Sequence, residues 1–200
     1  RLLKKDLHQK EKIREHLLRF SHLFDGINNK LNEFVDLFPV HPDYITYFEK
    51  IKHGKHQREI LKALSTNFLR MMEEDVPESD PGLITYDQYW NEISQPSMLS
   101  IPDIRTLKDK MEIIEDRINN HFTGARANRK VLASKISKAL AIRILCDDLD
   151  KKNGANALSL KEDICMTIPG VDDPEFLLDT VESTAKQLIN ATSGQYVDKD

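Results

Sequence analysis

The sequence predicts an all-α protein. Apolar residues recur at helical spacings of three and four along most of the chain. Glycine and proline are few, with 7 Gly and 8 Pro in 200 residues, whereas an all-β chain needs many tight turns. Hydrophobic residues make up 40% and charged residues 31%, which is typical of a soluble globular chain with a buried core.

Residues 13–38 have the clearest periodicity. Large apolar side chains follow one another at alternating spacings of four and three: Ile13, Leu17, Phe20, Phe24, Ile27, Leu31, Phe34 and Phe38. This heptad-like stripe predicts a long helix with one apolar face, kinked or broken near Gly26. The stripe must pack on another helix of this chain or on a coiled-coil partner, including a second copy.

A second helix is predicted to start at Val40–Asp43, because proline suits a first helical position and Asp43 suits the positive end of the helix dipole. Gly54 ends it. A longer helix is expected over residues 56–74. Its buried side would carry Ile60, Leu61, Leu64, Phe68, Leu69, Met71 and Met72.

The middle of the chain is rich in proline and serine, with loops at 76–82 and 94–100 around a short helix. A boundary near residue 95 therefore divides the chain into two expected domains, 1–95 and 96–200. In the second, a helix over 102–118 precedes three further helices and a strand that starts at Gln195. Ser159 would be the N-cap of the second of these three helices, because Glu162 follows it at capping-box spacing.

Three helices followed by a strand indicate either a winged-helix-like unit with a truncated wing or an ordinary three-helix bundle. The helix over 172–192 is too acidic to read a DNA groove. A basic patch is possible between Arg126 and Arg143, although helical spacing spreads its side chains around the axis. Its candidate residues are Arg126, Arg129, Lys130, Lys135 and Lys138. DNA binding stays an uncertain third alternative.

No complete active site is visible. The chain has no phosphate-binding loop, dinucleotide fingerprint, nucleophile elbow or HExxH motif. His53 and His56 have a possible metal spacing, but Gly54 interrupts the helix and no third ligand is placed, so we expect no metal. Cys146 and Cys165 form no CxxC pair and fit a reduced, cytoplasmic protein. Apolar runs are far shorter than the roughly 20 residues that cross a bilayer, so no membrane contact is expected.

Two short motifs of the sequence resemble those of a known family. FPVHPDY (residues 38–44) and QREILKALS (residues 57–65) are similar to the FPxHP and QRxxLxxLS/A words of large P-loop ATPases from bacterial phage-resistance systems, the BREX- and Pgl-like family. Further short words agree in the same order, at residues 81–84, 86–90, 139–141 and 193–196.

The resemblance implies a fragment that follows the ATPase core of a larger protein. That core would hold ATP and Mg²⁺ and would be the partner of this chain, which itself would need no cofactor. Residues 39–74 would form a helical lid and the last third a winged-helix-like domain. In such lids an arginine near a helix start reaches the γ-phosphate, and Arg58 matches that position. The planar guanidinium of an arginine can donate two hydrogen bonds to phosphate oxygens at once.

Each of these residues also has a plainer explanation. Arg58 would otherwise be a surface arginine paired with an acid such as Glu59, and His41 with Pro42 would simply cap a helix start. The competing hypothesis for the whole chain is a helical protein-interaction module that binds a partner or a second copy through residues 13–38.

Overall fold

The computed structural model describes residues 4–51, 54–71, 75–146 and 155–197. These residues confirm the all-α class: they form α-helices and short 3₁₀ turns, with only isolated β-bridges among them. The elements are α1 (Leu7–Leu18), α2 (Asp25–Asn29), α3 (Leu31–Leu37), α4 (Pro42–Lys50), α5 (Gly54–Met71), η1 (Tyr86–Gln88), α6 (Tyr89–Ile93), η2 (Pro96–Met98), α7 (Pro102–His121), η3 (Gly124–Arg129), α8 (Lys130–Leu145), α9 (Ala157–Ile164) and α10 (Pro174–Ala191). Within these ranges, no helix combines the length and apolar content that a bilayer crossing requires.

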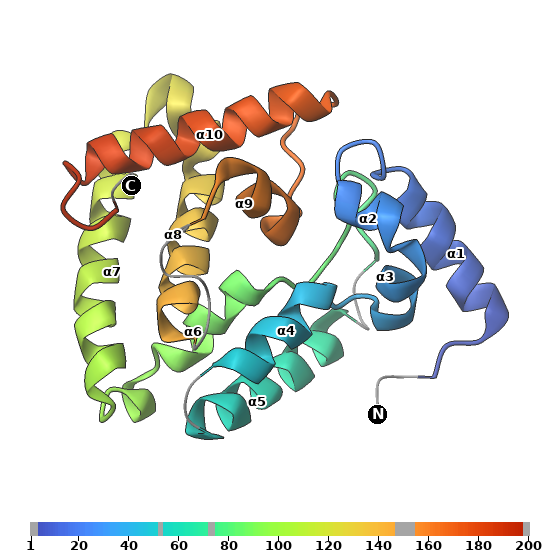
Figure 1. Cartoon of the computed structure of the whole chain (residues 1–200), viewed down its shortest axis with the longest axis horizontal. Helices are drawn as coiled ribbons and strands as arrows, with labels where there is room; N and C mark the ends of the chain where they lie inside the picture. Colours follow the sequence, from blue (N-terminus) through green and yellow to red (C-terminus); the bar gives the residue numbers. More distant parts are fainter. Residues whose placement is uncertain (1–3, 52–53, 72–74, 147–154, 198–200) are drawn as a thin grey trace.

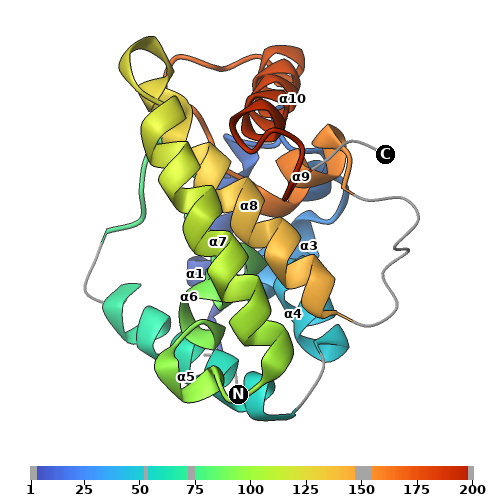
Figure 2. The ribbon, with the colours of Figure 1, turned by 90° about the vertical axis from the view of Figure 1, so that its left-hand side faces the viewer.

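The helices are arranged around α8. Helices α7 and α8 pack side by side, and α10 crosses both of them (Figure 1, Figure 2). Helix α9 packs against α8 and α10, while η1 and α6 pack against α8 from another side. Helices α1 to α3 form the opposite end of the molecule from α7 (Figure 1).

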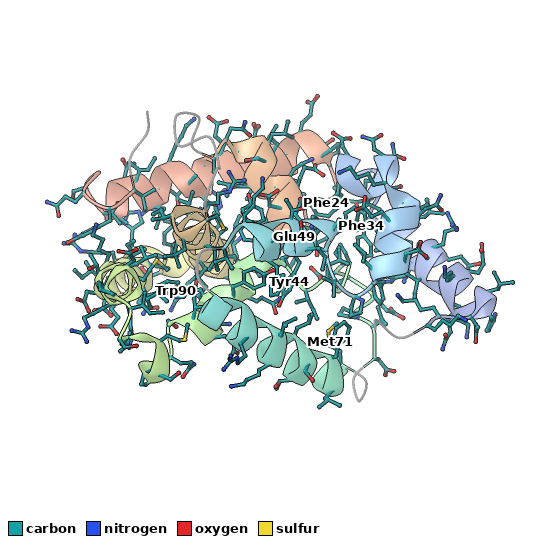
Figure 3. All side chains as sticks on the ribbon, turned by 60° about the horizontal axis from the view of Figure 1, so that its bottom comes forward. Phe24, Phe34, Tyr44, Glu49, Met71 and Trp90 are labelled. Carbon is teal, nitrogen blue, oxygen red and sulfur yellow. The ribbon has the colours of Figure 1, made fainter. Side chains whose placement is uncertain are left out.

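The buried apolar side chains form one connected cluster, from Leu17 in α1 to Leu188 in α10. Figure 3 shows Phe24, Phe34, Tyr44 and Trp90 in the crowded interior between the helices, and all four are buried. The cluster includes side chains from both sides of residue 95, where the boundary between two domains was expected. That boundary stays a prediction, but both halves contribute to the same core.

The single long helix expected over residues 13–38 is wrong. Helix α1 ends at Leu18, turns follow, and Phe24 adopts an extended conformation (φ −126°, ψ 109°) before α2 begins. The burial of the stripe is confirmed, because Leu17, Phe24 and Phe34 are almost completely buried in this chain's own core. The chain breaks because three short helices bring these side chains to one core, which a straight rod cannot do.

The predicted buried side of α5 is wrong at two positions. Leu64, Phe68 and Met71 are partly buried against the core, but Leu61 and Leu69 are 54% and 65% exposed. Helix α5 packs on α6 at the edge of the molecule, so only one of its sides meets the core. Met72 and the side chain of Ile60 lie outside the described part of the chain.

The C-terminal third differs from its prediction at the start of α9 and after the end of α10. The cap of α9 is Asn156, whose side chain accepts a hydrogen bond from the Ser159 amide at 2.7 Å, so Ser159 is not the cap. The strand expected at Gln195 is absent, because residues 195–197 form bends. Ser193 and Gly194 have positive φ, and the Gly194 amide bonds back to the carbonyl of Ile189, so the chain closes α10 instead of extending.

The start of α10 agrees with its prediction. Asp173 is the N-cap and accepts a hydrogen bond from the Phe176 amide at 2.7 Å, with Pro174 in the first turn. We expect Asp173→Ala to lower the free energy of unfolding by about 1 kcal/mol, measured by urea denaturation. Asp179→Ala, on an exposed position of the same helix, should change it by less than about 0.5 kcal/mol. Equal losses from both variants would contradict a capping role.

Candidate functional site

The most chemically elaborate part of the molecule is a buried polar cluster around Arg143. It joins four elements, since Arg143 lies on α8, Asp163 on α9, Tyr86 on η1 and Tyr47 on α4. An Arg143 Nη2 to Asp163 Oδ2 contact of 2.5 Å forms the ion pair, whose side chains are only 17% and 11% exposed. The Tyr86 hydroxyl donates to Asp163 Oδ2 at 2.9 Å and accepts from Arg143 Nε at 3.1 Å.

Aromatic rings close this Arg143 cluster on one side. Tyr47 stacks on Tyr86 with ring centroids 3.7 Å apart and an interplanar angle of 24°. The Arg143 guanidinium lies over the Tyr47 ring, 5.7 Å from its centroid, which is a cation–π contact. The charged group of Arg143 is therefore enclosed by an aromatic wall, a hydroxyl and a carboxylate.

The electrostatics of the cluster favour a structural role. Burial raises the pKa of Asp163, and the hydrogen bond and charge of Arg143 offset part of that rise. Burial also raises the pKa of Tyr47 to about 12, so its hydroxyl stays protonated near neutral pH. Each of these groups is satisfied by another group of the cluster, so none is placed as a ready general base.

His41 and Pro42 form the helix start that was predicted for them. Pro42 occupies the first turn of α4, and His41 Nδ1 accepts a hydrogen bond from the Asp43 amide at 3.1 Å. The imidazole is buried and meets the Phe34 ring edge-on, with centroids 4.9 Å apart. Burial lowers the pKa of His41 to about 4, so the ring is neutral at pH 7. His41 therefore caps backbone in this structure.

The backbone beside His41 joins two of the short sequence words. Val40 and Ile84 form a parallel bridge, in which the His41 amide donates to Ile84 O at 3.1 Å and the Ile84 amide donates to Pro39 O at 2.7 Å. The Phe38–Pro39 peptide bond just before it is cis. The word at residues 38–44 is therefore in direct contact with the word at residues 81–84.

Arg58 lies apart from the Arg143 cluster. It is exposed on α5, a helix that contributes no residue to that cluster. Helical spacing places Leu61, Lys62, Ser65 and Leu69 on the same face as Arg58, and all of them are exposed. We call these five residues the α5 outer face.

The candidate residues of the predicted basic patch lie in different surroundings. Arg129 Nη1 donates to Ser183 Oγ at 2.9 Å, and Lys135 Nζ lies 3.4 Å from the buried carboxylate of Asp87. Lys130 is exposed and Lys138 half-buried.

Of the other basic residues in that stretch, Arg126 lies 3.2 Å from a ring nitrogen of His121, and Arg143 is taken up by the buried cluster. Several of these cations thus serve contacts within the chain. Among the described side chains, no three potential ligands come together as a metal site; His53 and the side chain of His56 lie outside them.

The sequence interpretation missed Arg143 and Asp163. Arg143 is a single charged residue within an otherwise apolar stretch, residues 139–145, which is a signal for a buried, paired cation. Asp163 gives no comparable signal, because it follows Lys161 and Glu162 and looks like part of a solvated charge run.

Comparison with known proteins gives one result. A family model described as DUF6079 second domain matches residues 6–200. No curated protein and no solved structure matches the chain.

Proposed function

The chain belongs to the DUF6079 second-domain family, and from this premise we propose that it is a non-catalytic helical domain that couples nucleotide state to motion in a larger ATPase. The proposed parent is of the BREX- and Pgl-like kind found in bacterial phage resistance, in the cytoplasm. The description of the family as a second domain supports a parent with several domains. ATP and Mg²⁺ would bind the parent's core, upstream of this chain.

The observation that carries the proposal is the α5 outer face. Arg58 lies one helical turn before Leu61 on this face, and Leu61 and Leu69 are both more than half exposed. A guanidinium with apolar side chains next to it on the same helix face suits a contact that reaches a phosphate while excluding water around it. In the proposed lid, Arg58 would face the triphosphate and the two leucines would pack against the surrounding core.

The packing of the helices supports a route by which such a motion could pass. Helix α5 packs on α6, α6 and η1 pack on α8, and α8 packs on α7 and α10. No single long helix spans residues 13–38, so the motion would pass through these contacts between helices. The Arg143 cluster, which joins α4, η1, α8 and α9, would make that route stiff.

We expect Arg58→Ala in the intact parent protein to lower the rate of ATP hydrolysis by at least about tenfold, the equivalent of one charge-assisted hydrogen bond to phosphate. Arg58→Lys should hydrolyse ATP faster than Arg58→Ala, because lysine keeps the positive charge but cannot donate the paired hydrogen bonds of a guanidinium. Arg105→Ala, which removes an exposed arginine on α7, is the matched control and should leave the rate unchanged.

Two results would overturn the proposal: a parent protein without a phosphate-binding loop upstream of this domain, or normal hydrolysis by Arg58→Ala. In the competing hypothesis of an interaction module, Leu61→Asp and Leu69→Asp would abolish binding to a partner while Arg58→Ala would not. A dimer through residues 13–38 would need the exposed side chains of α1 to α3, because the apolar stripe packs inside the chain. Light scattering of the chain measures whether it forms such a dimer.

A further inference from the structure

Two consecutive side chains of α9 hold the turn that leads into α2. Lys161 Nζ donates to Leu23 O at 2.7 Å, although the Lys161 side chain is only 5% exposed. Glu162 accepts from the Gly26 amide at 2.9 Å and from the Asp25 amide at 3.3 Å. Lys161 and Glu162 also form an ion pair at 3.0 Å. Helix α9 thus supplies both a cation and an anion to one short stretch of backbone.

Helix α2 depends on this outside help. Its N-cap is Phe24, whose side chain cannot accept a hydrogen bond from the first amides. Glu162 takes that place from a position 136 residues away from Gly26. Gly26 permits the approach, because an added Cβ would lie only 3.2 Å from Glu162 Oε2. The glycine that the sequence marks as a helix break is therefore where another helix docks.

The next residue of α9 points to a different part of the fold. Asp163 binds Arg143 and Tyr86 in the Arg143 cluster. Because Glu162 and Asp163 are consecutive residues of the short helix α9, a displacement of this helix as a unit moves both of them. A shift of α9 that separates Asp163 from Arg143 also carries Glu162 away from the amides of α2.

We infer that Lys161, Glu162 and Asp163 form a latch on α9 that holds the Leu23–Gly26 turn only while Asp163 is paired with Arg143. The latch links the N-terminal helices to the centre of the fold through charged side chains, by hydrogen bonds to the backbone at Leu23–Gly26 and by an ion pair at Arg143. Buried charged contacts of this kind contribute little net stability, but they form only in one arrangement of the helices. The two states of the latch are therefore this arrangement and one in which the contacts are broken. The inference concerns this chain alone and does not depend on the proposed ATPase.

Hydrogen exchange of the Asp25 and Gly26 amides in the chain tests the latch, because these amides donate directly to Glu162. In Glu162→Gln, which keeps the shape but not the charge, we expect their exchange to be about tenfold faster. In Asp163→Asn, which does not touch α2, we expect the same two amides to exchange at least about threefold faster. Glu182→Gln, in the exposed ion pair with Lys186 on α10, is the matched control and should change neither amide.

Unchanged exchange of both amides in Asp163→Asn would show that the two contacts are independent and would overturn the latch. So would an equal acceleration at Met111 and Ile114 near the centre of α7, because that pattern reports loosening of the whole fold. Arg143→Lys is the second variant. It keeps the charge near Asp163 and should accelerate the two amides less than Asp163→Asn does.

Discussion

Arg143→Met should lower the free energy of unfolding by about 3–5 kcal/mol, the usual cost of removing one partner from a buried ion pair. Methionine fills much of the space of the arginine stem, so the loss reports mainly on charge. Asp163 would be left with the Tyr86 hydroxyl but without a cation, in a site where burial already raises its pKa. Urea denaturation monitored by circular dichroism gives the value.

A double variant separates the charge from the packing. In Arg143→Met combined with Asp163→Asn no charge is left unpaired, and the asparagine oxygen still accepts from the Tyr86 hydroxyl. We expect this double variant to be at least about 1 kcal/mol more stable than Arg143→Met alone. If the double variant is less stable than the single one, the loss comes from packing, and the ion pair is not the reason for it.

Acidification from pH 7 to pH 4 should destabilise the fold by about 3 kcal/mol through His41 alone. Burial lowers the pKa of His41 from 6.5 to about 4 in the folded chain. Between these two values the unfolded chain binds a proton that the folded chain does not, so stability rises with pH across this window. The contribution is complete above about pH 6.5 and is lost as the pH falls toward 4.

His41→Asn is the matched variant for this effect. Asparagine is a good N-cap and can accept from the Asp43 amide as His41 does, but it does not titrate. The difference between the two unfolding free energies should therefore change with pH by about 3 kcal/mol from pH 7 to pH 4. Burial lowers the pKa of His16 as well, which adds to the slope equally in both proteins and cancels in the difference. Parallel pH profiles would show that folding does not shift the pKa of His41, which would contradict this prediction.

The local features of this fold follow from the sequence, and the long-range ones do not. The His41–Pro42 start of α4 and the Asp173 cap of α10 depend on neighbouring residues, and both are read correctly from the chain. The start of α2 at Asp25 and Gly26 depends on Glu162, a distant residue that local periodicity cannot reveal. Leu61 and Leu69 look buried because their spacing is helical, yet spacing alone does not say which side of a helix meets the core.

The candidate site was hidden for the same reason. Arg143 and Asp163 are 20 residues apart, and the residues between them include a stretch, 147–154, that gives no periodic signal. Arg58 was singled out by resemblance alone, and the exposure of its neighbours on α5 adds a physical reason to look at it. A buried ion pair needs a three-dimensional partner before either residue stands out from ordinary surface charge.

The bridge between Val40 and Ile84 ties together two points of the chain that lie 44 residues apart along the sequence, with α4 and α5 between them. Helix α4 packs into the core through Tyr44 and Tyr47, whereas α5 packs on α6 at the edge of the molecule. An added or deleted turn in α5 is therefore expected to leave the paired Val40 and Ile84 in place. The length of α5 is thus a feature of this domain that can change while the central helices keep their alignment.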